Sequence, residues 1–143
     1  MAYITIETTI NAPIAQVWEK WTSPEHVQHW NFASPDWHSP KATSDLHVGG
    51  EFHYEMASKD GSMSFDFWGT FQEIDDQKSL AILIGDGRKM FVTFETTEAG
   101  TKVTEQFEPE NQNPEDMQQA GWQMILDNFK SYAERSEEHT SEL

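Results

Sequence analysis

Apolar and polar residues alternate at the start of the chain, where Ile4 and Ile6 are separated by Thr5 and followed by Glu7. A period of two residues is typical of a strand that buries one face. The pattern predicts a half-buried strand over residues 3–10.

Two short helices are predicted after this strand. Pro13 and Pro24 each stand where the first turn of a helix accepts proline, after Asn11 and Ser23 respectively. The first helix carries an apolar stripe at helical spacing, made of Ile14, Val17, Trp18 and Trp21. The second helix ends near Trp30.

The period of two returns after residue 40 and continues to residue 109. Asp60-Gly61 and Asp86-Gly87 are hairpin signals between alternating segments. The expected strands cover residues 41–47 (a weaker one), 51–58, 63–74, 101–109, and two strands within 79–97.

A long amphipathic helix closes the pattern. It begins near Asn113-Pro114, and its expected inner face is made of Met117, Gly121, Met124, Ile125, Phe129 and Tyr132. We therefore predict an α+β fold in which a curved antiparallel sheet of about six to seven strands wraps around the C-terminal helix.

One segment has no period at all. The stretch WNFASPDWHSP, residues 30–40, holds three large aromatic residues and two prolines. We expect Trp30 to anchor this loop to the core, and Phe32 and Trp37 to border a pocket entrance, because the prolines restrict the loop.

Composition narrows the class of partner. The formal net charge of −16 argues against nucleic acid and against anionic membrane surfaces, which bind clustered Lys and Arg. Six Trp, nine Phe and three Tyr supply a core, or line a hollow one. Cysteine is absent, so thiolate chemistry and Cys-ligated metal sites are excluded.

The two ends of the chain give further expectations. The start, MAYITIETTI, lacks a signal-peptide pattern, and no apolar run is long enough for a membrane span, so we expect a cytoplasmic protein. Residues 135–143, RSEEHTSEL, match the translation of a common sequencing-library adapter in one reading frame. We expect one domain over residues 1–134 followed by a non-native tail.

Several strings carry a family resemblance: INAPIAQVWEKWTSPEHVQHW, VGGEFHYEM, GSMSFDFWGTF, TKVTEQFE and GWQMILDNFKSY. With the element order, they resemble the helix-grip, START-like superfamily (SRPBCC proteins), in the branch named after the C-terminal domain of the Hsp90 ATPase activator. The resemblance covers residues 3–134 and implies a cavity between the sheet and the long helix.

Periodicity and the resemblance together give an expected ligand cavity. Its predicted residues are Phe32, Trp37, Phe52, Tyr54, Phe65, Phe67, Val92, Phe94, Glu105, Phe107, Met117, Gly121 and Ile125.

Glu105 is the one candidate for chemistry, and a weak one. It shares a strand face with Val103 and Phe107, so it is expected to face the cavity, where burial raises the pKa of a carboxyl group. His26 and His29 are three residues apart but lack a third ligand, so we predict no metal and no cofactor. Portable catalytic motifs are absent.

Three functions stay open. The leading one is binding of a small hydrophobic or amphipathic ligand by a monomer or homodimer without catalysis. The alternatives are a co-chaperone-like module that binds a chaperone, and a polyketide cyclase-like or hydrolytic enzyme that uses Glu105 or a loop histidine.

Overall fold

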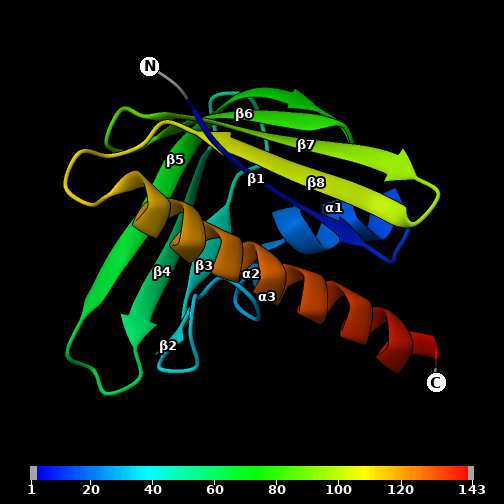
Figure 1. Cartoon of the computed structure of the whole chain (residues 1–143), viewed down its shortest axis with the longest axis horizontal. Coiled ribbons are helices and arrows are strands. Elements are labelled where there is room, and N and C mark those ends of the chain that lie inside the picture. The colour runs from blue at the N-terminus through cyan, green and yellow to red at the C-terminus, as the bar shows by residue number, and fades with distance from the viewer. Residues whose placement is uncertain (1–2, 142–143) are drawn as a thin grey trace.

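One antiparallel sheet and one long helix form the frame of the protein (Figure 1). The computed structural model describes the backbone of residues 3–141 and the side chains of residues 3–135. The helices are α1 (Ile14–Thr22), α2 (Pro24–Val27) and α3 (Glu115–Ser141). The strands are β1 (Ile4–Ile10), β2 (Trp37–His38), β3 (Ala42–Ser44), β4 (Glu51–Ser58), β5 (Ser64–Asp75), β6 (Ser79–Ile84), β7 (Lys89–Thr97) and β8 (Gly100–Phe107).

Strands β4 to β8 are neighbours in chain order, joined as successive hairpins. The sheet order is β1-β8-β7-β6-β5-β4-β2, and β3 also pairs with β4. A bulge between Phe71 and Glu73 interrupts the β5–β6 register, and bulges bend a strand and increase its twist. The curvature leaves one concave face for α3 to cover.

The predicted α+β, helix-grip architecture is confirmed by this arrangement. One short strand, β2, raises the strand number to eight, above the expected six to seven, whereas β3 falls within the weak strand expected over residues 41–47. Strand β2 (Trp37–His38) lies inside the segment that has no sequence period, because two residues are too few to establish one.

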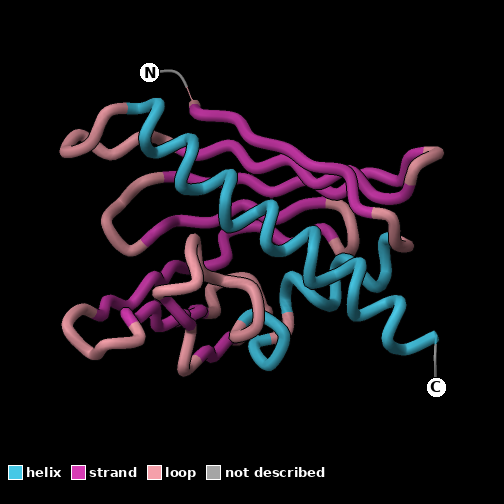
Figure 2. The backbone as a smooth tube through the Cα atoms, turned by 60° about the horizontal axis from the view of Figure 1, so that its bottom comes forward, coloured by secondary structure: helices cyan, strands magenta, loops and turns pink. Residues whose placement is uncertain are grey.

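Helix α3 runs diagonally over the concave side of the sheet, and α1 and α2 lie beside its C-terminal half (Figures 1 and 2). The core there is aromatic. The ring of Trp21 stacks on that of Trp30 at 4.9 Å, and Phe129 meets both rings edge-on at 5.0 and 4.8 Å. Trp30 is 3% exposed, and its Nε1 donates a hydrogen bond to the Lys20 carbonyl over 3.0 Å. It anchors the loop as predicted.

The inner face of α3 agrees with the prediction at Ile125, Phe129 and Tyr132 but differs from it in the N-terminal part of the helix. Met117 and Met124 were expected inside, but their side chains are 59% and 49% exposed. The neighbouring Gln118 is buried instead, because its amide donates to the Glu110 and Asn113 carbonyls and accepts from the Glu110 N–H. A polar side chain that is fully hydrogen-bonded can occupy a core position, so apolar spacing alone misplaced Met117 and Met124.

The expected tail lies mostly beyond what is described. The backbone of α3 continues to Ser141, but side chains from residue 136 onward lie outside the described residues. A non-native origin of residues 135–143 therefore stays a prediction. Across the described part of the chain, none of the helices combines the length and the apolar character needed to cross a membrane.

Candidate functional site

A partly open cavity of about 300 Å³ lies between the concave sheet, the helix pair α1–α2 and the middle of α3. Every one of the strands β4 to β8 contributes to its wall or rim. The lining residues are Trp21, Thr22, Trp30, Asn31, Phe52, Tyr54, Met56, Phe65, Phe67, Phe71, Leu80, Ile82, Arg88, Met90, Glu105, Glu110, Trp122 and Ile125.

The wall formed by β4 and β5 is a cluster of phenyl rings around Phe52. This ring lies 5.7 Å from that of Phe67 and 5.4 Å from that of Phe71. Gly69 permits the cluster, since a Cβ at that position would lie 3.0 Å from the Phe52 ring and 2.8 Å from the Leu83 carbonyl oxygen. Phe65 also belongs to the lining and is 52% exposed.

Glu105 brings a carboxyl group into this apolar wall. It lies in β8 between Val103 and Phe107, and it pairs across the sheet with Ile6 and Val92. Its side chain is 4% exposed and makes no hydrogen bond or ion pair with any of the described residues. Burial raises the pKa of the Glu105 carboxyl to about 8, because charge is poorly solvated there.

Asn31 provides a second unpaired polar group. It follows α2, its backbone N–H donates to the Val27 carbonyl, and its side chain is 6% exposed. The Nδ2 atom has no hydrogen-bond partner within residues 3–135. Thr22 also lines the cavity, but its hydroxyl already donates to the Trp18 carbonyl over 2.8 Å. Asn31 and Glu105 are thus two buried lining residues with unused hydrogen-bonding capacity.

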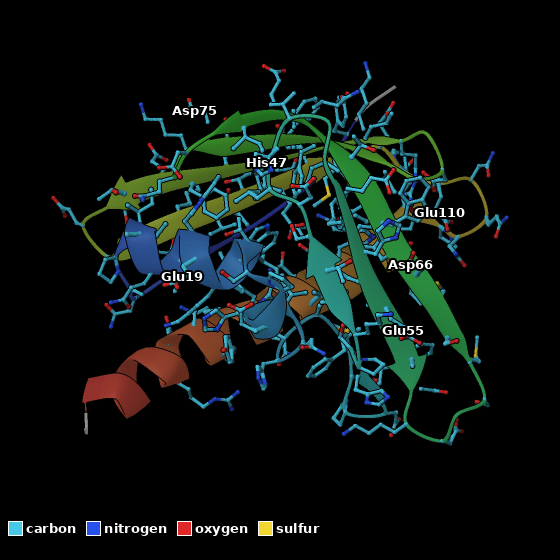
Figure 3. The ribbon with its side chains drawn as sticks, turned by 180° about the vertical axis from the view of Figure 1, so that it is seen from behind. Glu19, His47, Glu55, Asp66, Asp75 and Glu110 are labelled. Carbon is cyan, nitrogen blue, oxygen red and sulfur yellow. The ribbon has the colours of Figure 1, made fainter. Side chains whose placement is uncertain are left out.

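The charged lining residues Arg88 and Glu110 both have partners. Arg88 bonds Asp86 through Nε at 2.8 Å and donates to the Glu108 carbonyl through Nη1 at 3.1 Å. Glu110 lies in the connection between β8 and α3, visible near the start of the helix in Figure 3. Its carboxylate accepts the N–H groups of the next turn of chain. Burial raises the pKa of the Tyr54 hydroxyl, so this phenol stays neutral.

Six of the thirteen predicted cavity residues line the cavity: Phe52, Tyr54, Phe65, Phe67, Glu105 and Ile125. Three others are buried in solid packing instead. The ring of Phe107 stacks on Trp122 at 3.7 Å, Phe94 contacts Trp18 edge-on at 5.1 Å, and Val92 is fully buried. They share the correct sheet face, but Trp18 of α1 lies against Phe94 and Trp122 of α3 lies against Phe107.

The remaining four predicted residues lie away from the lining. Phe32 is half-buried, and the Trp37 ring lies 6.0 Å from that of Phe65, one residue removed from the cavity. Met117 faces solvent. A Cβ on Gly121 would meet nothing within 4 Å, so this glycine is neither a close contact nor part of the lining.

Sequence reasoning missed Trp122 and Asn31, which matter most among the additions. Trp122 stands four residues after buried Gln118, so the helical period from that glutamine would have found it. Asn31 carries no periodic signal, because it lies in the loop after α2. The strand pattern also failed to assign three residues of β6 and β7 to the cavity, although they alternate toward the same face: Leu80, Ile82 and Met90.

The histidines in the described part of the chain do not assemble a metal site. His26 Nδ1 lies 2.6 Å from the Tyr132 hydroxyl, and the His29 ring stacks on the Tyr132 ring at 5.6 Å. Among the described residues, no group of three or more His, Asp and Glu side chains is placed to hold a metal ion. His38, in β2, pairs with Ala57 at the sheet edge and is absent from the cavity lining.

A curved antiparallel sheet around a long C-terminal helix, with a cavity between them, defines a helix-grip protein of the SRPBCC type. The chain belongs to the activator of Hsp90 ATPase homolog 1-like family, whose model matches residues 11–134. Both the superfamily and the branch inferred from the sequence strings are confirmed.

Solved structures agree with this assignment. The AHSA1-like protein from Aeromonas hydrophila is 45% identical with a TM-score of 0.89, and the match covers 94% of this chain and 93% of that one. A protein from Cytophaga hutchinsonii is 47% identical with a TM-score of 0.81, covering 96% and 95%. A protein from Nitrosomonas europaea shares the fold at 21% identity, with a TM-score of 0.81 and 95% and 96% coverage. None of the curated proteins compared with the sequence matches it.

Proposed function

We propose that this protein binds a small hydrophobic or amphipathic ligand in the cavity between the sheet and α3, without catalysing a reaction on it. The observation that carries the proposal is an apolar cavity of about 300 Å³ whose wall holds two buried polar groups without partners. Ligand sites are commonly of this size or larger, apolar, and provided with a few polar groups that orient the ligand.

The unpaired groups distinguish this cavity from a packing defect. A buried donor or acceptor without a partner costs about 1–3 kcal/mol, so a fold used only as a core would tend to lose it. Asn31 and Glu105 each incur that cost in the same cavity. A ligand that satisfies both groups would recover it, and a solid core could not.

A plug in the cavity tests the proposal. Ile125 lines the cavity on α3, and Ile125→Trp would fill it with an indole ring. Met124, the next residue on the helix, is 49% exposed, so Met124→Trp adds the same ring on the solvent face. Thermal shift and native mass spectrometry against a library of small amphipathic molecules measure binding.

We expect saturable hits for the wild type and for Met124→Trp, and their loss for Ile125→Trp with an unchanged or higher melting temperature. Hits that survive equally in Ile125→Trp place binding elsewhere on the protein and contradict the proposal.

Chaperone binding is the second candidate, and the description of the matching family carries it. If it holds, the protein stimulates the ATPase of an Hsp90-type chaperone, and Ile125→Trp stimulates it equally because the plug leaves the outer surface unchanged. No stimulation at high molar excess removes this candidate. For either function we propose a cytoplasmic location.

A further inference from the structure

We propose that the cavity selects an amphipathic amine, with its ammonium group against Glu105 and its apolar body among the aromatic rings of β4 and β5. This inference rests on the proposed function and specifies the ligand class. It starts from the surroundings of one side chain, because Glu105 is buried at the cavity wall and has no partner among the described residues.

The side chains nearest Glu105 in the sheet cannot form a hydrogen bond or an ion pair with it. Its strand neighbours on the same face are Val103 and Phe107, and its register partners are Ile6 and Val92, all of them apolar. The cavity is the remaining side from which a partner can reach the carboxyl group. A partner that enters there must donate a hydrogen bond to an ionised carboxylate, or share one with the protonated acid.

The other ionisable groups of the lining do not compete for this role. Arg88 already binds Asp86 and the Glu108 carbonyl, and Glu110 accepts from the N–H groups of residues 112 and 113. Tyr54 is neutral, since burial raises the pKa of its hydroxyl. Arg88, the cation of the lining, is therefore already paired with Asp86, whereas the Glu105 carboxyl is unpaired among the described residues.

Charge favours an amine over a fatty acid or another anion. Hydrogen bonds between ionised partners are roughly twice as strong as neutral ones, so an ammonium gains more from Glu105 than a hydroxyl does. A ligand carboxylate would add a second negative charge beside Glu105 in a medium of low polarity. The formal net charge of −16 also attracts cations toward the protein and repels anions from it.

Asn31 adds a second, weaker criterion. Its Nδ2 is an unused donor in the same cavity, so an ether, hydroxyl or carbonyl oxygen on the ligand would be bound in addition. The volume of the cavity limits the size of the ligand. A volume of 300 Å³ corresponds to about ten waters of liquid, which indicates a ligand on the order of ten non-hydrogen atoms.

Binding of such an amine should release a proton, whereas binding of an uncharged apolar ligand should not. In the free protein at pH 7 the Glu105 carboxyl is mostly protonated, because its pKa is about 8. When the ammonium enters, the O–H bond of the acid breaks and the proton passes to the buffer, leaving a carboxylate paired with the cation. About one proton is released for each amine bound.

Three probes with one apolar body test the proposal: 1-naphthylmethylamine, 1-naphthalenemethanol and 1-naphthoate. Isothermal titration of the full chain at pH 7, in two buffers of different ionisation enthalpy, gives affinity and proton release together. For the wild type we expect the amine to bind best and the carboxylate worst. Only the amine should release close to one proton.

The variant Glu105→Gln keeps the shape and removes the charge. It should weaken amine binding by about tenfold or more, leave the alcohol within about threefold, and abolish proton release. Glu7→Gln, on the exposed face of β1, is the matched control and should behave as the wild type.

The remaining outcomes separate the two proposals. If all three probes bind equally and Ile125→Trp abolishes them all, the cavity binds ligands but the amine preference is overturned. Carboxylate binding as tight as amine binding, or amine binding without proton release, also overturns it. If no probe binds the wild type at millimolar concentration, the amine proposal falls, and the library screen against Ile125→Trp decides the proposed function separately.

Discussion

The two halves of α3 cover the same sheet but differ in how closely their side chains are packed against it. Around its C-terminal half, Leu126, Phe129 and Ala133 are fully buried against α1, α2 and β1; we name this region the solid half. Around its N-terminal half, Trp122 and Ile125 face the cavity; we name this region the hollow half.

The difference shows where a helix-grip fold places its stability and where it leaves room. Three aromatic rings and the helix pair α1–α2 fill the solid half. No helix other than α3 covers the β4–β5 end of the sheet in Figure 1. Substitutions should therefore have opposite consequences in the two halves, with stability lost in one and binding lost in the other.

The largest effect is expected from truncation in the solid half. Phe129→Ala removes a fully buried ring that contacts both Trp21 and Trp30, and should lower the free energy of unfolding by about 3–5 kcal/mol. Ile125→Ala in the hollow half should cost less than about 2 kcal/mol, because its side chain already borders empty space. Urea unfolding measures both. Equal costs would contradict the division into halves.

The next effect is a gain of stability in the hollow half. The pKa of Glu105 rises from 4.5 in the unfolded chain to about 8 in the folded one. The folded state therefore holds a proton that the unfolded state loses, and stability falls as the pH rises from about 4.5 through about 8. Glu105→Gln removes this dependence and should be more stable than wild type by about 4 kcal/mol at pH 8.

The gain should vanish as the pH falls well below 4.5, to about pH 3.5, where wild-type Glu105 is protonated in both states. Urea unfolding at several pH values, with exposed Glu7→Gln as the control, gives the comparison. A constant difference between wild type and Glu105→Gln across that range would show that the carboxyl is not buried as described.

A smaller effect contrasts two glycines. Gly121→Ala places a methyl group in open space on α3 and should stabilise the protein by about 0.5–1 kcal/mol through helix propensity. Gly69→Ala forces a Cβ against the Phe52 ring and the Leu83 carbonyl and should destabilise it by about 1–3 kcal/mol. Thermal unfolding distinguishes them. Destabilisation by Gly121→Ala would mean that α3 packs closely at that point.

The smallest effect concerns polar residues of strands β4 and β5 that lie at the protein surface. His53 bonds Asp66 at 2.7 Å and Glu51 at 2.9 Å, and its ring stacks on Trp68 at 5.4 Å. Figure 3 shows Asp66 on this β4–β5 hairpin. The hydrogen bonds to Asp66 and then Glu51 raise the pKa of His53 above 6.5.

This stabilisation is complete below pH 6.5 and is lost as the pH rises through the folded-state pKa. His53→Gln should therefore cost more at pH 5.5 than at pH 8.5, by at most about 1 kcal/mol, because solvent screens exposed pairs. Chemical unfolding at the two pH values measures it, and an equal cost at both would assign the effect to the ring stack on Trp68.

Periodicity predicted the fold well because each long strand and α3 repeats its pattern over several turns or residue pairs. It failed where a single residue broke the pattern. Gln118 is polar and buried, which shifted the assigned face of α3 and hid Trp122. The two-residue strand at Trp37–His38 carries too little sequence for any period.

For the cavity, sequence identified the correct face of each strand but not how far the packing extends along it. Phe67 and Phe94 obey the same alternation, yet Phe67 lines the cavity and Phe94 is enclosed by Trp18 and Trp21. That outcome depends on where α1 lies over the sheet. Tertiary placement of this kind has no counterpart in a strand's own residues.

The pairing of β1 with β8 has a consequence for synthesis of the chain. Ile4 pairs with Phe107 and Ile10 with Thr101, whereas β4 to β8 pair with their neighbours in sequence. During translation the first strand emerges long before its partner exists, and its isoleucines have no sheet to join. We expect the hairpins to assemble first, since their loops close at low entropic cost, and β1 to dock when β8 leaves the ribosome.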